Sequence, residues 1–300
     1  MSVLTRENFL SWRTSKRVRG SIQATIAYIL LVALAAFNIL PLLWMISGSF
    51  KSNAEVLASP PIWIPRTWHW ENYVNAFRAL PFPRFFLNTM IVITFVLIGT
   101  LLANTLVAFG FARLRARARN LIFLVLLATM MLPSQVTWLS VYIIFAKLPG
   151  PGPGGNWIDT FLPLIVPSYF GSAFLVFMLR QFFLTVPLEL DEAARIDGAS
   201  TFQVYRHIFL PQARPALATI VILTFIGQWK EYFAPLIYLN TPTKFTLALG
   251  VQYFRGFADY ATQWHLLMAA GTALTIPPLL VFLFFQRYFV AGLALTGLKG

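Results

Sequence analysis

The sequence predicts an all-α, polytopic membrane protein with six transmembrane helices. Of its 300 residues, 58% are hydrophobic and 11% are charged, whereas a soluble domain averages about 45–50% apolar and about 25% charged residues. The chain therefore has more apolar surface than one soluble core can bury, which excludes an ordinary soluble enzyme and a disordered protein. It contains no cysteine, so disulfides, thiolate metal sites and cysteine nucleophiles are excluded as well.

Six mostly apolar stretches are long enough to cross a bilayer, which takes about 20 helical residues. We expect these spans at residues 22–46, 85–109, 121–145, 161–183, 216–239 and 266–289. Pro163 and Pro167 interrupt the start of the fourth span, and prolines also lie in the fifth and sixth. Neighbouring helices can satisfy the carbonyls that a proline leaves free, so these stretches remain acceptable spans.

The first span is interpreted as an anchor that is not cleaved. It follows a basic start, and Ala33-Leu34-Ala35 offers a small-residue cleavage site. The apolar run nevertheless continues to Ile46, which is too long for the apolar region of a signal peptide.

The basic residues indicate how the spans are oriented. An even number of spans puts both termini on one side. Fifteen of the 23 Lys and Arg residues fall on that side, including the Arg113–Arg119 connection, against seven on the other. Because cytoplasmic loops carry the excess of Lys and Arg, we expect residues 1–21 and the 291–300 tail in the cytoplasm. The net charge of +13 thus reflects topology, and no aromatic-interleaved basic surface indicates nucleic-acid binding.

An acidic cluster marks the connection between the fourth and fifth spans. Four of the ten acidic residues fall within nine positions of each other, namely Glu189, Asp191, Glu192 and Asp197. Pro187 can open a helix here, and acids in its first turn complement the helix dipole. Gly198 can end that helix in a left-handed conformation.

A second short helix is expected directly after the glycine. Ser200 or Thr201 can cap it, and it is predicted to run to about His207. Pro211 is expected to stop it before the fifth span. The loop of residues 186–214 is therefore predicted to form two short helices at an angle, outside the bilayer.

Three interpretations of this helical pair compete. It can be an ordinary interfacial hairpin, a DNA-binding helix-turn-helix, or a protein-docking element that transmits force to the spans. Two membrane spans lie only a few residues away on either side, which makes access for a DNA duplex unfavourable.

The residues of this loop resemble a known signature. Glu192-Ala193-Ala194, then three residues, Gly198, nine residues, and Ile208-Phe209-Leu210-Pro211 match the EAA signature of ABC-importer permease subunits in spacing and type. Other stretches resemble the carbohydrate-uptake branch, the maltose-type second permease, over nearly the whole chain. They are residues 188–198 (LELDEAARIDG), 208–218 (IFLPQARPALA), 228–236 (QWKEYFAPL), 286–292 (QRYFVAG) and 87–89 (LNT).

The resemblance implies a permease domain at residues 22–290 and a set of partners: a second permease subunit, two cytoplasmic ATPase subunits and an extracytoplasmic solute-binding protein. Glu192 is implied to face a basic ATPase residue, Gly198 to set the bend, and the small and apolar residues to pack into the ATPase cleft. The tail at 291–300 resembles family tails that reach the ATPase pair. The ATPase-coupling residues implied in this way are Glu192, Ala193, Ala194, Ile196, Asp197, Gly198, Ala199, Ile208, Leu210 and Pro211.

The chain is not expected to be an enzyme. It has no GxxxxGK[ST] phosphate-binding loop and no GxSxG nucleophile motif. Its three histidines are scattered without metal-ligand spacing. No catalytic residue, metal or cofactor is expected, and ATP with magnesium is implied to bind the partner ATPase.

Polar residues inside a span usually face the bundle interior or a watery path. The stretch Gln228, Trp229, Lys230, Glu231 and Tyr232 in the fifth span is therefore a candidate for the translocation pathway. A salt bridge to a partner subunit, or a Lys230 side chain that reaches the outer headgroups, fits equally well. Related permeases often carry Asn-Asp or Asn-Glu at the 230–231 pair, and Lys230 departs from that pattern.

The sequence thus predicts a permease subunit of an ABC importer for a sugar or sugar-like solute, which works by alternating access in a bacterial or archaeal cytoplasmic membrane. The alternatives are a stand-alone carrier coupled to an ion gradient and a membrane scaffold that moves no solute. The solute stays open, because mono-, di- and oligosaccharides, polyols and glycerol phosphate all fit.

Overall fold

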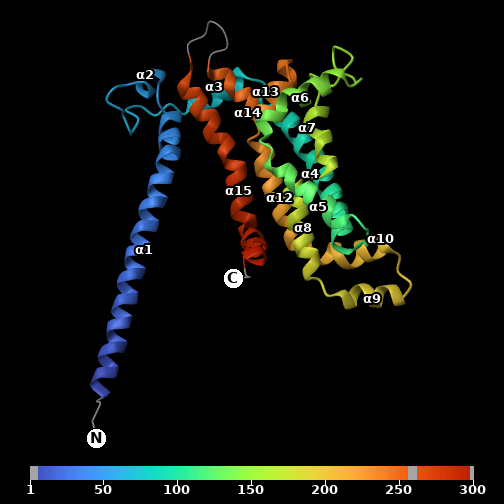
Figure 1. Ribbon diagram of the computed structural model, residues 1–300. Coiled ribbons are helices and arrows are strands. Elements are labelled where there is room, and N and C mark those ends of the chain that lie inside the picture. Colours follow the sequence, from blue (N-terminus) through green and yellow to red (C-terminus); the bar gives the residue numbers. More distant parts are fainter. Residues whose placement is uncertain (1–5, 256–261, 298–300) are drawn as a thin grey trace.

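The regular structure of the chain is helical (Figure 1). The computed structural model describes residues 6–255 and 262–297, with side chains described for 21–133, 136–252, 254–255 and 262–286. Within these ranges there is no strand, only an isolated bridge between Pro149 and Asn156. Residues 1–5 and 298–300 of the expected terminal segments lie outside the described residues.

Three helices are much longer than the rest: α1 (Arg6–Ser49), α4 (Phe82–Arg113) and α15 (Trp264–Gly297). The shorter α-helices are α2 (Asn53–Val56), α3 (Glu71–Ala79), α5 (Arg119–Ala128), α6 (Ser134–Lys147), α7 (Leu162–Ile165), α8 (Ala173–Thr185), α9 (Leu188–Ile196), α10 (Thr201–Val204), α11 (Leu210–Gln212), α12 (Arg214–Trp229), α13 (Phe233–Tyr238) and α14 (Leu247–Gly250). Short 3-10 turns are η1 (Thr129–Met131), η2 (Val166–Phe170), η4 (Pro242–Lys244) and η5 (Val251–Arg255), and η3 (Tyr205–Phe209) is π-helical.

Four segments are each long and apolar enough to cross a membrane: Ser21–Ser49, Phe82–Arg113, Leu162–Thr185 and Trp264–Gln286. They coincide with the first, second, fourth and sixth expected spans. The number of candidates rises to six when two bent helix pairs, Arg119–Met131 with Val136–Lys147 and Thr201–Gln212 with Arg214–Trp229, are each counted as one span.

The third expected span, at 121–145, is bent and not straight. The chain bends by 105° between the helical segments that end at Met131 and begin at Val136. Pro133 lies at this bend and Leu132 is extended, with a ψ of 118°. A proline disfavours helical backbone in the residue before it, so the helix ends there although the apolar run continues.

The fourth and fifth expected spans are also interrupted. Between η2 and α8, Gly171 takes a φ of +83°, a left-handed conformation that breaks the helix at a place the prolines did not mark. Helix α12 ends at Trp229, and α13 starts only at Phe233. Lys230 was expected inside a helix, and instead it caps the carboxyl end of α12.

Both ends of the described chain lie at the same end of the molecule. Figure 1 shows that α1 begins and α15 ends on the side where α9 and α10 lie, whereas α2, α3, α13 and α14 lie at the opposite end. We call these the α9 end and the α3 end. Helix α1 diverges from the other helices toward the α9 end (Figure 1), and the most apolar window of its Ser21–Ser49 segment has no buried residue.

Two buried clusters hold the bundle together. The cluster near the α3 end joins α4, α12 and α15 around Phe85, Trp229 and Ala269. The other, near the α9 end, joins α4 and α8 to the segment after α9 around Phe109, Phe183 and Phe209. Phe209, from the segment after α9, is fully buried in this second cluster, so the α9–α10 region belongs to the packed body of the protein.

Candidate functional site

Helix α9 begins and ends at the residues that the sequence marked. Pro187 is its N-cap, and Glu189 and Asp191 lie in its first turn. At its end, Gly198 has a φ of +80°. The Gly198 N–H donates to the Arg195 carbonyl at 3.1 Å, and the Ala199 N–H donates to the Ala194 carbonyl at 2.9 Å. This pair of bonds is the Schellman motif, which confirms the prediction of a left-handed glycine that ends the helix.

The second limb begins with a capping box. The Gln203 N–H donates to the Ser200 hydroxyl at 3.3 Å, and the Ser200 N–H donates to the Gln203 side-chain oxygen at 2.7 Å. Ser200 rather than Thr201 is therefore the cap. We refer to the segment from Leu188 to Gln212, with α9 as its first limb and α10–η3–α11 as its second, as the α9–α10 hairpin.

The expectation that Pro211 stops the second limb is wrong. The limb continues through Pro211 to Gln212. It does so by widening, because the Leu210 N–H donates to the Tyr205 carbonyl five residues earlier, as in a π-helix. A proline has no N–H to bond within a helix, and the wide turn directly before it accommodates the ring.

The second limb is anchored by aromatic contacts to α4 and α8. The Phe209 ring lies 5.1 Å from that of Phe109 on α4 and 5.5 Å from that of Phe183 on α8. The Tyr205 hydroxyl makes a hydrogen bond of 2.7 Å with the Thr105 hydroxyl on α4. Aromatic pairs contribute about 0.5–1.5 kcal/mol beyond their buried area, so these contacts hold this limb on α4 and α8.

The first limb, by contrast, presents uncovered side chains. Glu192 and Ala193 are exposed, and 85% of the Ile196 surface is accessible. Ala194 and Ala199 instead pack against the cluster of Phe109, Phe183 and Phe209. The other residues expected in coupling divide in the same way: Ile208 and Leu210 pack inward, and Asp197, Gly198 and Pro211 are exposed.

A groove of about 370 Å³ lies between the two limbs. Its lining comes from both limbs and is mixed in character: Ala194, Asp197, Gly198, Ala199, Gln203, Val204, His207 and Ile208. Leu188, Ile196 and Phe202 of the hairpin are all exposed. Several exposed apolar residues together with an exposed acid are features of a surface that receives another protein.

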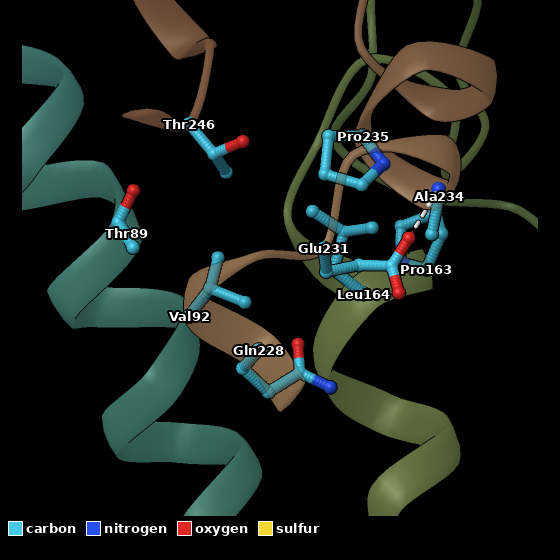
Figure 2. Close-up of a pocket in the computed structure, with 9 residues that line it drawn as sticks. All are labelled: Thr89, Val92, Pro163, Leu164, Gln228, Glu231, Ala234, Pro235 and Thr246. Atoms are coloured by element: carbon cyan, nitrogen blue, oxygen red, sulfur yellow. Dashed lines mark hydrogen bonds between the residues drawn. The ribbon is translucent and has the colours of Figure 1, made fainter. Parts of the chain in front are cut away.

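A small cavity with both polar and apolar lining residues lies toward the other end of the molecule. Its volume is about 120 Å³, and it is lined by Thr89, Val92, Pro163, Leu164, Gln228, Glu231, Ala234, Pro235 and Thr246. Figure 2 shows Thr89 and Val92 of α4 on one side, Glu231 and Pro235 on the other, and Gln228 below. The Thr246 hydroxyl is buried without a hydrogen-bond partner, and an unpaired buried hydroxyl is costly.

A second cavity of about 340 Å³ adjoins the first, because Leu164 and Gln228 line both. Helix α4 contributes Val96, Thr100 and Asn104 to it, and α12 contributes Thr224 and Gly227. The polar side chains along both cavities are hydroxyls and amides, with Glu231 as the charged exception. Among the residues that line them there is no lysine or arginine.

The five residues expected in the pathway do not stay together. Gln228 and Glu231 line the cavities, and the Glu231 carboxylate accepts the Ala234 N–H at 3.1 Å. Trp229 is buried, and its indole N–H donates to the Leu274 carbonyl on α15 at 2.9 Å. Lys230 is exposed, and Tyr232 packs against the core cluster around Phe85. Because the helix breaks after Trp229, the side chains of these five residues point in different directions.

Sequence reasoning missed the buried carboxylate of Asp159, which joins distant segments at the α3 end. This buried carboxylate accepts the N–H groups of Asn240 and Thr241 at 2.9 Å, and the Lys244 ammonium at 3.0 Å. Burial alone acts to raise the pKa of Asp159, but the hydrogen bonds from Thr241, Asn240 and Lys244 outweigh it and hold the pKa below its ordinary range. Its partners lie about 80 residues away in sequence, so no local pattern marked it.

No group of three or more His, Cys, Asp or Glu side chains in the described part of the chain is placed to hold a metal ion. The features that can bind a partner or a solute are therefore the α9–α10 hairpin and the two cavities. Helix α4 joins them, because its last turns pack on the hairpin and its middle and start line the cavities.

Residues 95–294 match the family described as the binding-protein-dependent transport system inner membrane component. The chain is 33% identical over 266 residues to the diacetylchitobiose uptake system permease protein NgcG of Streptomyces coelicolor. This match covers 88% of this chain and 85% of that protein. It is 31% identical over 278 residues to the sn-glycerol-3-phosphate transport system permease protein UgpE of Rhizobium meliloti. This match covers 90% of this chain and 96% of that protein.

The fold is similar to a solved structure as well. A chain in the crystal structure of a bacterial ABC transporter involved in the import of the acidic polysaccharide alginate superposes with a TM-score of 0.75 at 22% identity. The match covers 92% of this chain and 98% of that one.

Proposed function

The chain belongs to the binding-protein-dependent transport system inner membrane component family, and from that premise we propose that its α9–α10 hairpin couples ATP hydrolysis to the import of a neutral sugar. The chain is the multi-pass permease subunit of an ATP-binding-cassette importer, and the ATPase is a separate partner. A second permease subunit and an external binding protein complete the importer. The family assignment leaves no support for a stand-alone carrier driven by an ion gradient.

The observation that carries the coupling role is the division of the hairpin into two limbs. The second limb is fixed to α4 and α8 by Tyr205 and Phe209. The first limb offers Glu192 and Ile196 to the outside. A surface with an exposed acid beside an apolar residue suits a partner cleft that contains a basic residue. ATP and magnesium bind the partner ATPase subunits in this account.

We propose six spans, with the bent α5–η1–α6 segment as the third and α12 with α13 as the fifth. The 16 residues of α12 extend about 24 Å, which is short of the hydrocarbon thickness of about 30 Å, so α13 completes the crossing. The termini and the hairpin lie in the cytoplasm. This is supported by the start of α1 and the end of α15, which lie on the side of the hairpin in Figure 1, and by the excess of Lys and Arg in these segments.

The chemistry of the cavities favours an uncharged solute rich in hydroxyls. Threonine, serine, asparagine and glutamine side chains supply donors and acceptors for such a solute. An anionic solute would meet the Glu231 carboxylate and no cation of this chain in the lining, which is unfavourable in a site of low dielectric. Diacetylchitobiose, named for one relative, has this neutral chemistry, whereas glycerol phosphate and alginate do not.

The proposed function is tested with the complete importer in proteoliposomes. We expect uptake to require ATP on the side of the ATPase subunits and to be unaffected by collapse of ion gradients. The solute that the binding protein delivers is expected to be a neutral sugar, and Gln228→Leu is expected to slow its uptake, because Gln228 lines both cavities. An anionic cargo, or uptake without ATP, would contradict the proposal.

A further inference from the structure

One arginine connects three elements at the α9 end. Arg113 is the last residue of α4, and its guanidinium donates to the Phe183 carbonyl on α8 at 2.8 Å and to the Val186 carbonyl just beyond α8. The same guanidinium lies over the ring of Phe209, 4.7 Å from its centre. A single side chain therefore joins the end of α4 to the end of α8 and to the second limb of the hairpin.

The carbonyls that Arg113 binds follow from helix physics. The last carbonyls of a helix have no partner within that helix and carry the negative end of its dipole. Arg113 satisfies two carbonyls at the end of α8, directly before Pro187 and the start of α9. The position at which the first limb leaves α8 is thus fixed by a residue of α4.

Arg113 and Asp191 also carry two buried polar atoms that lack hydrogen-bond partners, the Arg113 Nε and the Asp191 Oδ1. Asp191 is only 7% exposed, and its negative charge stabilises the Arg113 guanidinium electrostatically. No ion pair within 4 Å joins the two among the described residues. A buried polar atom without a hydrogen-bond partner is costly, so a movement that brings the Asp191 Oδ1 to the Arg113 Nε is favourable.

The two acids of α9 point in different directions. Asp191 and Glu192 are adjacent, and adjacent helical positions lie about 100° apart around the axis. Asp191 is buried toward the body of the protein, and Glu192 is exposed. Helix α9 therefore presents one acid outward, where a partner can act on it, and one inward, within electrostatic range of Arg113.

We propose that Arg113 is a positioning residue that transmits movement of α9 to α4, with Asp191 as its counter-charge. A displacement of α9 by the ATPase subunits brings the Asp191 carboxylate to the free Nε of Arg113, and the end of α4 follows. Because α4 lines both polar cavities, this movement reaches the solute path. The proposal rests on the proposed coupling function of the hairpin and adds the route by which the movement travels.

The test measures solute uptake and ATP hydrolysis in parallel, in the complete importer reconstituted with its binding protein. Arg113→Lys keeps the charge but loses the planar fork that binds two carbonyls and stacks on a ring. We expect the solute transported per ATP hydrolysed to fall about fivefold or more, the lower end of typical coupling between sites, while the complex assembles and hydrolyses ATP. Asp191→Asn is expected to lower the same ratio.

The double variant and a control decide whether the two residues act together. If they form one link, Arg113→Lys with Asp191→Asn lowers the ratio no further than the stronger single change, because the effects of residues in one interaction network do not add. Arg115→Lys, at an exposed position two residues away, is expected to leave the ratio unchanged. Effects of the two single variants that multiply would contradict the proposal.

The remaining outcomes are also decisive. A wild-type ratio in Arg113→Lys overturns the role of Arg113. If Arg113→Lys does not assemble, Asp191→Asn decides alone, and a wild-type ratio in that variant overturns the proposal. Failure of the proposed function looks different, because the unchanged importer itself would then show no uptake that depends on ATP.

Discussion

Gly198 determines the angle between the two limbs of the hairpin. Its φ is +80°, and a Cβ built there meets no atom within 4 Å, so backbone strain and not a clash limits substitution. A residue other than glycine costs about 1–2 kcal/mol in this conformation, although asparagine tolerates it. We expect Gly198→Asn to keep ATP-coupled uptake and Gly198→Pro, whose φ is fixed near −65°, to abolish it.

The measurement for Gly198 is uptake by the reconstituted importer, with co-purification of the permease from membranes as the check on insertion. Gly198→Asn is the matched control, since it changes the side chain and keeps the conformation. Normal uptake by the proline variant would show that the bend at Gly198 is not required.

Asp159 holds together the loops at the opposite end. The carboxylate form is stabilised in the folded state, because its pKa there is lower than in the unfolded chain. That stabilisation is present above the ordinary carboxyl pKa of about 3.9 and is lost only as the pH falls through the lower folded-state value. We therefore expect the contribution of Asp159 to be the same at about pH 5 and about pH 8.

Replacing this carboxylate tests that expectation. Asp159→Asn removes the ion pair with Lys244 and weakens the bonds to Asn240 and Thr241, and we expect it to lower the free energy of unfolding by about 1–3 kcal/mol. Thermal unfolding of the two proteins at both pH values measures the difference. A difference between them that disappears on going from about pH 8 to about pH 5 would contradict the assigned role.

At the scale of elements, composition and spacing predicted the ends of those helices whose start or stop is set by residues within a few positions. The Schellman end at Gly198 and the cap at Ser200 follow from residues within a few positions. The breaks at Pro133, Gly171 and Lys230 were missed, because an apolar run has the same composition whether its helix is continuous or interrupted. Backbone conformation at one residue makes that difference.

Long-range contacts were missed for a different reason. Arg113 binds a carbonyl 70 residues away, and Asp159 binds groups more than 80 residues away. On the sequence alone, Arg113 counted only as one of the basic residues that set topology. Its role depends on α4 and α8 ending at the same level, and this is a property of the packed bundle.

Helix α9 is expected to be the element that the ATPase covers. Because the chain has no cysteine, a single Ile196→Cys reports on this surface, and Ile64→Cys reports on the α3 end. Both side chains are exposed, at 85% and 74%. We expect a thiol reagent that does not cross membranes to label Ile196→Cys from the cytoplasmic side in the permease alone and much less once the ATPase subunits are bound.

Ile64→Cys is the matched control for this labelling. It is expected to react from the outer side only, with or without the ATPase. Equal labelling of Ile196→Cys in both states would place the ATPase elsewhere, and labelling of both positions from one side would contradict the proposed topology.

For the whole molecule, the arrangement places the coupling surface at the last turns of α4 and the solute cavities along the middle and start of the same helix. Helix α4 packs on the hairpin near Phe109 and lines the cavities from Asn104 to Thr89. Since its last residue also clamps the end of α8, movement at the hairpin and a change of the cavities are mechanically linked. Alternating access then requires only that ATP and loaded binding protein favour different states.

The central claim is that ATP drives uptake through the exposed face of α9. It is tested most directly by the rate of solute uptake into proteoliposomes that contain the complete importer, comparing the unchanged chain with Glu192→Lys. We expect the reversed charge to lower ATP-driven uptake by at least about fivefold while the permease stays in the membrane. Uptake by Glu192→Lys at the unchanged rate would contradict the account.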